Sequence, residues 1–338
     1  MNVLLTCAGR RNYLINAFQE ALQGRGQVYA ADCLSDAPAL QEADMGFVLP
    51  SVEHPDYTEK LLQLCQERQI GLLVPLNDLE LPRLSTLTES LRAVGTIAVI
   101  SSPAVIDCCS DKLATDQFLR KHQIPMPRTY LALQDVLTKM ENSEQPLSVI
   151  VKPRWGSGSI GIHAAEDAEE LRLAYHFAGK AVKNSCIARE EETQHEPSLL
   201  IQERITGDEY GLDVINDLQG RYVTTLVKRK LSMRAGETDR AVTVHDPELE
   251  ALGKRLGQTL GHVGNLDCDV IVGAEGPRVI ELNPRFGGSY PFSHQAGANL
   301  PAALVAWARG ETPNPAWLRV RENVTSAKCD RLVECGKS

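Results

Sequence analysis

The first hundred residues alternate between strand-like and helix-like patterns, and this alternation restricts the fold more than any other feature of the chain. Short apolar runs recur at NVLLTC, QVYAADC, GFVLP, IGLLVP and TIAVIS. Such runs are typical of strands that are buried on both faces of a parallel sheet. Between them, residues 13–22, 57–68 and 81–93 carry apolar side chains at helical spacing. The pattern predicts a doubly wound α/β unit, in which ligands bind outside the carboxyl ends of the strands.

The turn after the first strand, CAGRRNY at residues 7–13, differs from a dinucleotide-binding turn. It holds one glycine, whereas the motif G-x-G-x-x-G needs three so that a pyrophosphate can approach. The sequence therefore argues against nicotinamide and flavin. Arg10 and Arg11 either meet an anionic substrate at the helix start or form a solvated pair. Asp32 ends the second strand, where an acid often contacts a ribose, but without the glycines this signal is weak.

Charge and hydropathy argue against several classes of protein. The 338 residues have a net charge of -9, and the lysines and arginines are scattered, which argues against a nucleic-acid partner. No apolar run approaches the length of a membrane span, and the start, MNVLLTCAGRRNYL, soon turns polar and cationic, so we expect neither membrane insertion nor a secretory signal. The nine cysteines include no CxxC pair. This favours reduced thiols in a cytoplasmic protein over a disulfide framework or a zinc site.

The stretch VIELNPRFGG, residues 279–288, places two oxygen ligands on one strand. Glu281 and Asn283 are two positions apart and therefore point to the same face. Asp269 lies far enough upstream to sit on a neighbouring antiparallel strand, joined through a GAEGP turn. Asp267 shares the face of Asp269, so periodicity leaves open which aspartate joins the cluster. Because buried carboxylates are costly unless they are paired or bind a metal, and magnesium prefers oxygen ligands, we predict a magnesium site.

A glycine-rich loop follows another apolar strand in VKPRWGSGSIG. Its glycines and serines give a flexible turn whose backbone amides can converge on phosphate oxygens. It is not a Walker A loop, because its lysine precedes the glycines and a strand follows them. A tight turn with a surface lysine is the alternative interpretation. The candidate residues of this segment are Lys152, Gly156, Ser157, Gly158, Ser159 and Gly161.

Five motifs occur in a specific order: SDKLATDQFL, VIVKPRWGSGSIG, IQERITGDEYGLDV, RAGETDRAVTV and VIELNPRFGGSYPFSHQAGANLP. In this order they resemble the ATP-grasp superfamily, and within it the group related to the synthetase halves of carbamoyl-phosphate synthase. The resemblance covers nearly the whole chain. It implies an ATP-grasp fold of mixed α/β and α+β class, preceded by a Rossmann-like domain. The expected division is 1–105 for that first domain, 106–200 for an N-terminal subdomain with the glycine-rich lid, 201–320 for a C-terminal subdomain with the metal site, and 321–338 for a tail.

The resemblance also implies which residues bind ATP. The two lysines of the family that contact the phosphates match Lys112 and Lys152, although Lys112 at a helix start is alternatively a solvated charge. The loop at 156–161 resembles the lid over the triphosphate. The hinge acid beside the adenine matches Glu203, with backbone groups through Ile205 reading the base. The acid that binds the ribose hydroxyls matches Glu209, for which a simple loop acid is the alternative.

For the reacting end of the nucleotide, the family spacing favours Asp269 over Asp267, so the implied metal ligands are Asp269, Glu281 and Asn283. Arg285 matches the arginine that meets the transferred phosphoryl group or the substrate. Arg285 and Lys152 are therefore the catalytic candidates.

The activity that the resemblance implies is an ATP- and Mg²⁺-dependent ligation. A carboxylate would be activated as an acylphosphate and joined to an amine, with release of ADP and phosphate. The implied partners are a small-molecule carboxylate and a small-molecule amine, and a homodimer is compatible with the pattern. The stretch VKRKLSMRAGETDRAVTV is expected to form a substrate-side loop, with charges at Lys228, Arg234 and Arg240 that either neutralise an anionic substrate or are solvated.

Two other functions remain open at this point. One is a phosphorylating enzyme like carbamoyl-phosphate synthase, although this chain has one synthetase-like half and no repeat. The other is a nucleotide-binding regulatory protein that keeps the fold without turnover.

Overall fold

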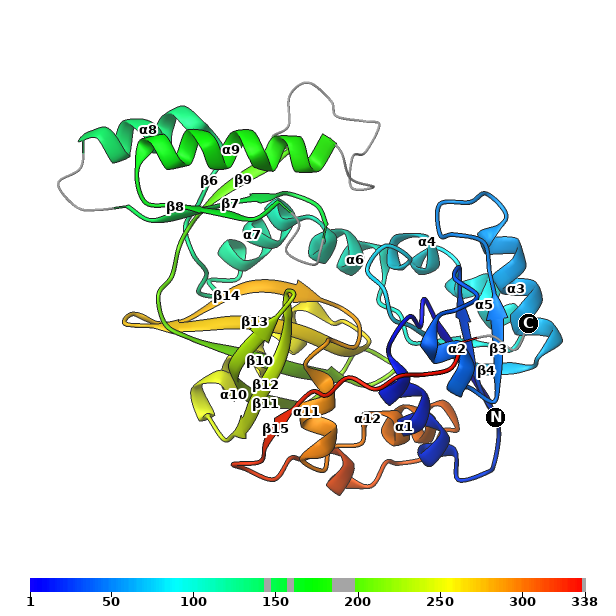
Figure 1. The fold of residues 1–338 in the computed structure, drawn as a ribbon. Coiled ribbons are helices and arrows are strands. Elements are labelled where there is room, and N and C mark those ends of the chain that lie inside the picture. Colours follow the sequence, from blue (N-terminus) through cyan, green and yellow to red (C-terminus); the bar gives the residue numbers. More distant parts are fainter. Residues whose placement is uncertain (143–146, 157–160, 184–197, 336–338) are drawn as a thin grey trace.

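The computed structural model describes residues 1–142, 147–156, 161–183 and 198–335, which form three sheets and the helices around them (Figure 1). Ser157, Gly158 and Ser159, which belong to the glycine-rich loop predicted from the sequence, lie outside the described residues. Among the described residues no helix is long and apolar enough to cross a membrane.

The first sheet is the predicted parallel one. Its strands are β1 (Asn2–Thr6), β2 (Val28–Asp32), β3 (Met45–Val48), β4 (Ile70–Pro75) and β5 (Ile97–Ala98), in the order β3-β2-β1-β4-β5. The helices between them are α1 (Asn12–Leu22), α2 (Pro38–Glu42), α3 (Tyr57–Glu67), α4 (Leu81–Ser85) and α5 (Thr88–Ala93). The winding direction reverses between β1 and β4, so the segments that follow these two strands border the crevice where such folds bind ligands.

A small antiparallel sheet follows in the chain. It has the order β6-β9-β7-β8, with β6 (Thr129–Tyr130), β7 (Val149–Pro153), β8 (His163–Ala165) and β9 (Leu199–Glu203). Two helices, α8 (Leu133–Asn142) and α9 (Ala168–Lys183), lie together over the outer face of this sheet (Figure 1). Alternate strand residues such as Val149, Val151 and Ile201 are buried against Leu171 and Ala178 of α9, which gives this lobe its own apolar core.

Two helices connect the first sheet to this lobe: α6 (Pro103–Ser110) and α7 (Lys112–Lys121). Asp111 caps the start of α7, because its carboxylate accepts a hydrogen bond from Leu113 N at 2.9 Å. Arg154, just after β7, also holds this carboxylate, through Nε at 2.8 Å and Nη2 at 2.6 Å. The start of α7 is thereby fixed beside the end of β7.

The third sheet has six strands in the order β14-β13-β10-β11-β12-β15. They are β10 (Asp208–Asn216), β11 (Tyr222–Arg234), β12 (Glu237–Val244), β13 (Gly264–Gly273), β14 (Gly276–Asn283) and β15 (Thr325–Ala327). Helix α10 (Pro247–Leu260) packs Leu249 and Leu256 against Val214 and Leu266, so one face of the sheet is apolar and closed. The other face carries the polar residues discussed below.

The segment 227–244 is not the loop that its polar residues suggested. It forms the antiparallel strands β11 and β12, in which Val227 pairs with Val244 and Arg234 with Glu237. The strand alternation is hidden in the sequence because the ladder shifts register between Lys230 and Ser232 and again before Met233.

The C-terminal elements return to the first domain. They are α11 (Tyr290–Gln295), α12 (Leu300–Ala308), a 3₁₀ helix (Pro315–Leu318) and then β15, which lies within the segment expected as a tail. One apolar cluster includes Phe18 of α1 together with Phe286, Tyr290 and Leu304. The first sheet and the six-stranded sheet therefore share a core, and the sheet's polar face is held against the first domain.

Candidate functional site

The predicted acids lie on one face of the six-stranded sheet, in adjacent rows set by the strand register. Asp269 pairs with Glu281 and Asp267 with Asn283 across β13 and β14. On the other side of β13, β10 places Gly211 beside Asp269. Like charges directly opposite each other are unfavourable in a sheet. A pair such as Asp269 and Glu281 is therefore stable only with cations close by.

Lys230 is one such cation, and the sequence analysis did not identify it. Its Nζ donates to Glu209 Oε1 at 2.6 Å and to Asp269 Oδ1 at 2.7 Å, and its side chain is only 4 % exposed. Burial alone would lower the pKa of this ammonium, but Asp269 and Glu209 reverse the effect and raise it. Desolvation raises the pKa of Asp269 and nearby Asp267 adds to the rise, while Lys230 opposes it. Lys230 is thus charged and joins the ribose candidate Glu209 to the metal candidate Asp269.

Asp267 belongs to a different set of contacts. Its Oδ2 accepts from Arg285 Nη1 at 3.2 Å, and its Oδ1 accepts from Ser289 Oγ at 3.1 Å. A Cβ added at Gly287 would lie 2.0 Å from the Asp267 carboxyl carbon, so only glycine leaves room for this carboxylate. Of the two aspartates that periodicity could not separate, Asp269 faces Glu281 and Asp267 faces Arg285.

Arg285 connects the acid face to the first domain. Its Nη2 donates to Asp78 Oδ2 at 2.7 Å, and Asp78 follows β4 at the crevice of the parallel sheet. From the turn after β1, Arg11 Nη1 donates to the carbonyl oxygen of Phe286 at 3.0 Å, and from the start of α1, Tyr13 OH donates to the carbonyl oxygen of Gly287 at 3.3 Å. The switch-point edge of the first sheet therefore faces the loop after β14. Arg11 is bound to the protein there, whereas Arg10 is exposed.

The other cations named from the sequence have different surroundings. Lys228 is fully buried and paired with Asp213 at 2.5 Å, with Ser293 also within hydrogen-bond reach of its Nζ. It is therefore a structural charge, and the expectation that it meets an anionic substrate from a loop is wrong. Arg234 is held by Asp330 at 2.6 Å and by Asp239 at 3.1 Å. Arg240 is an exposed side chain on β12.

The two predicted ATP lysines lie on the opposite wall from the acids. Lys112 begins α7, and its Nζ donates to the Gly156 carbonyl oxygen at 2.6 Å while approaching Glu281 Oε1 to 3.6 Å. Lys152 on β7 donates from Nζ to Gln202 Oε1 at 2.8 Å. Burial, and then the nearby Lys112, lower the pKa of Lys152 to about 8. The structure therefore brings Lys112, Lys152 and Glu281 together.

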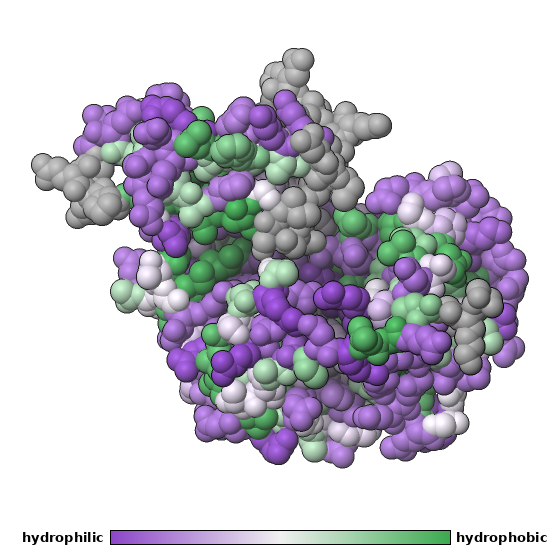
Figure 2. Space-filling model, viewed as in Figure 1, coloured by the Kyte–Doolittle hydropathy of each residue, from purple (hydrophilic) through white to green (hydrophobic). Residues whose placement is uncertain are grey.

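A cleft runs between these two walls. Its lining includes Lys112, Lys152 and Gln202 on one side and Val279 to Leu282 of β14 on the other. Figure 2 shows apolar surface in the recess between the α8–α9 lobe and the six-stranded sheet. The cleft encloses only about 10 Å³ in this structure, so its interest lies in the charges that converge on it.

The remaining nucleotide candidates lie around this cleft. The described ends of the glycine loop have positive φ angles, +106° at Gly156 and +70° at Gly161, which glycine adopts without strain. Glu203, at the end of β9, is exposed, and its backbone N–H donates to the Arg128 carbonyl oxygen at 2.8 Å. Ile205 is partly buried beside Gly273. Neither Glu203 nor Ile205 lines the cleft as described.

The donor set of Asp269, Glu281 and Asn283 fits a hard divalent cation. It offers two carboxylates and an amide oxygen, which are the ligands that magnesium prefers. In the described parts of the chain, no group of three or more His, Cys, Asp and Glu side chains is arranged for a metal ion. A magnesium site at these residues would therefore need the amide oxygen of Asn283 and phosphate oxygens of a bound nucleotide as further ligands.

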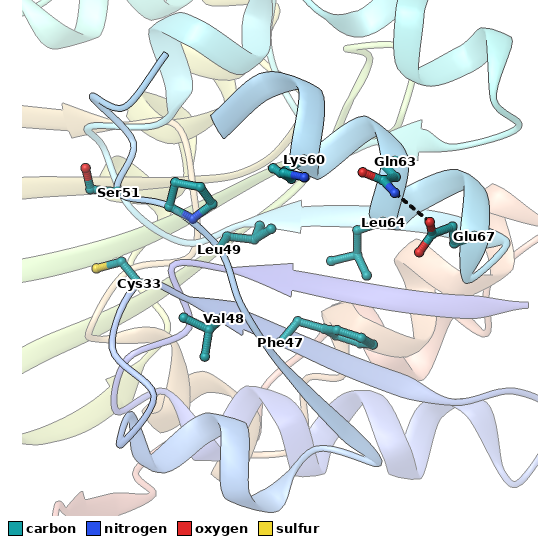
Figure 3. Close-up of a pocket in the computed structure, with 10 residues that line it drawn as sticks. Cys33, Phe47, Val48, Leu49, Ser51, Lys60, Gln63, Leu64 and Glu67 are labelled. Atoms are coloured by element: carbon teal, nitrogen blue, oxygen red, sulfur yellow. Dashed lines mark hydrogen bonds between the residues drawn. The ribbon is translucent and has the colours of Figure 1, made fainter. Parts of the chain in front are cut away.

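A larger cavity of about 710 Å³ lies elsewhere, beside the edge strand β3 and helix α3 (Figure 3). Phe47, Val48 and Leu64 form its apolar wall. Its polar side chains include Gln63 and Glu67, which bond to each other at 2.7 Å. It contains none of the predicted site residues. Its size does not make it the candidate site, because the converging charges are in the other cleft.

Comparisons with known proteins agree with the fold. Residues 109–289 match the family described as ATP-grasp domain, and residues 3–100 match the family described as PylC-like, N-terminal domain. The uncharacterized protein y4rH of Sinorhizobium fredii is 30% identical over 200 residues, which are 55% of this chain and 38% of that protein. The chain thus spans well under half the length of this relative.

Solved structures show the same fold at low identity. Biotin carboxylase from Campylobacter jejuni has a TM-score of 0.74 at 14% identity, covering 94% of this chain and 73% of that one. The biotin carboxylase domain of Hydrogenobacter thermophilus 2-oxoglutarate carboxylase has a TM-score of 0.71 at 18% identity, with coverages of 96% and 73%. N5-carboxyaminoimidazole ribonucleotide synthetase from Thermotoga maritima has a TM-score of 0.64 at 14% identity, with coverages of 93% and 77%. The predicted ATP-grasp fold with a preceding parallel-sheet domain is confirmed, and because the ATP-grasp domain match extends over more than half of its residues, this chain belongs to the ATP-grasp family.

Proposed function

We propose that this chain is an ATP- and Mg²⁺-dependent ligase that activates a carboxylate as an acylphosphate and joins it to an amine, releasing ADP and phosphate. The observation that carries the proposal is the approach of Lys112 Nζ to Glu281 Oε1, at 3.6 Å, across a cleft that also holds Lys152. Lys112 is a cation that can bind phosphate, and Glu281 is an anion that can bind a metal ion. At this distance the oxygens of one triphosphate can contact both Lys112 and the metal ion. The Hydrogenobacter thermophilus domain was solved with MgADP and bicarbonate, which supports the same cofactors here.

The roles proposed for individual residues are those that the resemblance to ATP-grasp enzymes implies, and they are supported where Lys112, Lys152 and Glu281 line one cleft. Lys112 and Lys152 are proposed to hold the phosphates, and the glycine-rich segment 156–161 is proposed as the phosphate lid. Glu209 meets the ribose, and Glu203 with the backbone through Ile205 meets the adenine. Asp269, Glu281 and Asn283 hold the metal, which when bound would neutralise and align the γ-phosphate. Arg285 stabilises the transferred phosphoryl group or the substrate carboxylate.

The location, the partners and the domain boundaries are also proposals. We propose a cytoplasmic location, small-molecule carboxylate and amine substrates, and a homodimer. The proposed domain boundaries remain 1–105, 106–200, 201–320 and 321–338.

Turnover separates a ligase from a nucleotide-binding regulatory protein. We expect the purified chain to bind ATP with magnesium and to release ADP only when the carboxylate and amine are both supplied from a metabolite mixture. ADP release is measured with a coupled assay, and the ligated product by its mass. The Lys152→Ala variant is the background control, because it lacks a phosphate contact. Tight ATP binding without ADP release in any mixture would instead support the regulatory function, and no ATP binding would contradict both.

The lowered pKa of Lys152 predicts a pH dependence of ATP binding. In the free protein the ammonium loses its proton as the pH rises through about 8, and the neutral amine attracts phosphate less. Affinity for ATP should therefore fall between about pH 7 and about pH 9.5, and binding at the higher pH should take up a proton. Calorimetry in buffers of different ionisation enthalpy measures both effects. The Lys152→Arg variant stays charged throughout, so the same pH dependence in that variant would assign the effect to another group.

A further inference from the structure

We infer that Lys230 is a built-in cation of the nucleotide site, which takes the place of a second metal ion and leaves one divalent cation to bind with the nucleotide at Asp269, Glu281 and Asn283. The inference rests on the proposed function, because it concerns how the same site holds ATP and magnesium.

The path of the Lys230 side chain is the first observation. Lys230 stands on β11, while its partner Asp269 stands on β13, with β10 between them. It crosses β10 near Gly211, where an added Cβ would lie 3.4 Å from Lys228 Cε and 3.6 Å from Lys230 Cε. Because Gly211 has no side chain, it leaves space for the side chains of Lys228 and Lys230. Lys230 reaches through it to both acids at 2.6 Å and 2.7 Å, in a setting where its side chain is almost fully enclosed.

The distribution of charge on the face is the second observation. Four carboxylates of the face have a cation within 3.2 Å: Asp213 with Lys228, Asp267 with Arg285, and both Glu209 and Asp269 with Lys230. Glu281 differs, because among the described residues its ion-pair partner is Lys112, at the longer distance of 3.6 Å, and its side chain is 30% exposed. Glu281 is therefore less neutralised than the other four acids.

The free oxygens mark where a metal can bind. No hydrogen bond to the Asn283 side chain occurs within the described residues, and Asp269 uses only Oδ1 toward Lys230. The open oxygens are thus those of Glu281, the amide of Asn283 and Oδ2 of Asp269, which suffice for one ion that also shares phosphate oxygens. A second ion between Asp269 and Glu209 would have to displace a buried ammonium from two close ion pairs. Such a displacement is costly, because the ammonium would lose both partners inside the protein.

Lys230 couples the proposed binding of the ribose to the proposed binding of the metal. Because its ammonium contacts both Glu209 and Asp269, it fixes the carboxylate that would bind the ribose relative to the carboxylate that would bind the metal before any ligand is bound. Lys230 is therefore a positioning residue for nucleotide and metal together.

Counting bound manganese tests the inference directly. Mn²⁺ substitutes for Mg²⁺, and its free concentration is followed by electron paramagnetic resonance while the full-length protein, saturated with ADP, is titrated. We expect one Mn²⁺ per ADP-loaded wild-type chain. Two Mn²⁺ per wild-type chain would overturn the inference without recourse to any variant. Failure of ADP and ATP to bind at all would overturn the proposed function instead.

Variants give the second measurement. Lys230→Met keeps the length of the side chain but removes its charge, so a second Mn²⁺ should bind between Glu209 and Asp269. When no metal is added, the affinity of this variant for ADP should fall about tenfold or more. Lys230→Arg should retain the single ion. Lys254→Met, on the exposed side of α10, is the matched control and should behave as wild type. One Mn²⁺ and unchanged ADP affinity in a folded Lys230→Met protein would contradict the role assigned to Lys230; if that variant does not fold, Lys230→Gln is measured in its place.

Discussion

An exchange of Glu281 for glutamine is expected to leave the protein folded while ligation falls by about a thousandfold or more. The fold should tolerate the change because glutamine keeps the shape of the side chain, and because Glu281 lies directly opposite Asp269, so that losing its charge relieves a repulsion. Catalysis should not tolerate it, because Glu281 is the acid of this face with the weakest internal partner. Its charge is available for a ligand rather than for the fold. Thermal unfolding and single-turnover product formation measure the two effects separately.

A control for this variant is available in the same hairpin. Glu275, in the turn between β13 and β14, pairs with Arg278 and its side chain is 87% exposed. Glu275→Gln should therefore keep both stability and activity. Ligation at the wild-type rate in Glu281→Gln would refute the metal assignment. A large drop in the unfolding temperature would show instead that Glu281 has a structural role.

The acid cluster could be predicted because it depends on local periodicity. Two strands joined by a short turn fix which residues face each other, and Asp269 and Glu281 are indeed cross-strand partners. The choice between Asp267 and Asp269 could not be made from periodicity alone, since both point to the same face. It requires the contacts of Asp267 with Arg285, which come from the fold around the strand.

The cations that organise the cluster were beyond sequence reasoning for a related reason. Asp78 is 207 positions from its partner Arg285, and no pattern of spacing connects a loop of the parallel sheet with a strand end so far along the chain. Lys230 lies in a run of basic residues whose alternation is broken by two register shifts, so the stretch looked like a loop with solvated charges. A glycine on the neighbouring strand, Gly211, was the available signal, because a glycine inside a strand often marks a close approach of another group.

The arrangement of Arg285 also explains why a guanidinium, rather than an ammonium, should be needed at this position. Its two terminal nitrogens contact different carboxylates, Nη2 with Asp78 and Nη1 with Asp267, at 2.7 Å and 3.2 Å. Since Asp78 belongs to the first domain and Asp267 to the six-stranded sheet, the planar group is held by both parts of the protein. A lysine has one point of charge and cannot keep both contacts in the same geometry.

Arg285→Lys and Lys152→Ala should therefore fail in different ways. Arg285→Lys should bind ATP with an affinity within about threefold of wild type but ligate about a hundredfold more slowly, because it loses an interaction needed at the transferred group and not at the rest of the nucleotide. Lys152→Ala should weaken ATP binding itself by roughly thirtyfold, the effect of losing one charged contact to phosphate. Nucleotide titration and single-turnover product formation distinguish the two, with Arg278→Lys, on β14 before the loop that carries Arg285, as the control that should change neither. The proposed role of Arg285 would be contradicted if Arg285→Lys ligated at the wild-type rate, or if it lost ATP affinity as severely as Lys152→Ala. In either case the contacts of Arg285 with Asp78 and Asp267 would serve only to join the two parts of the protein. The group that meets the substrate would then be another cation of the cleft.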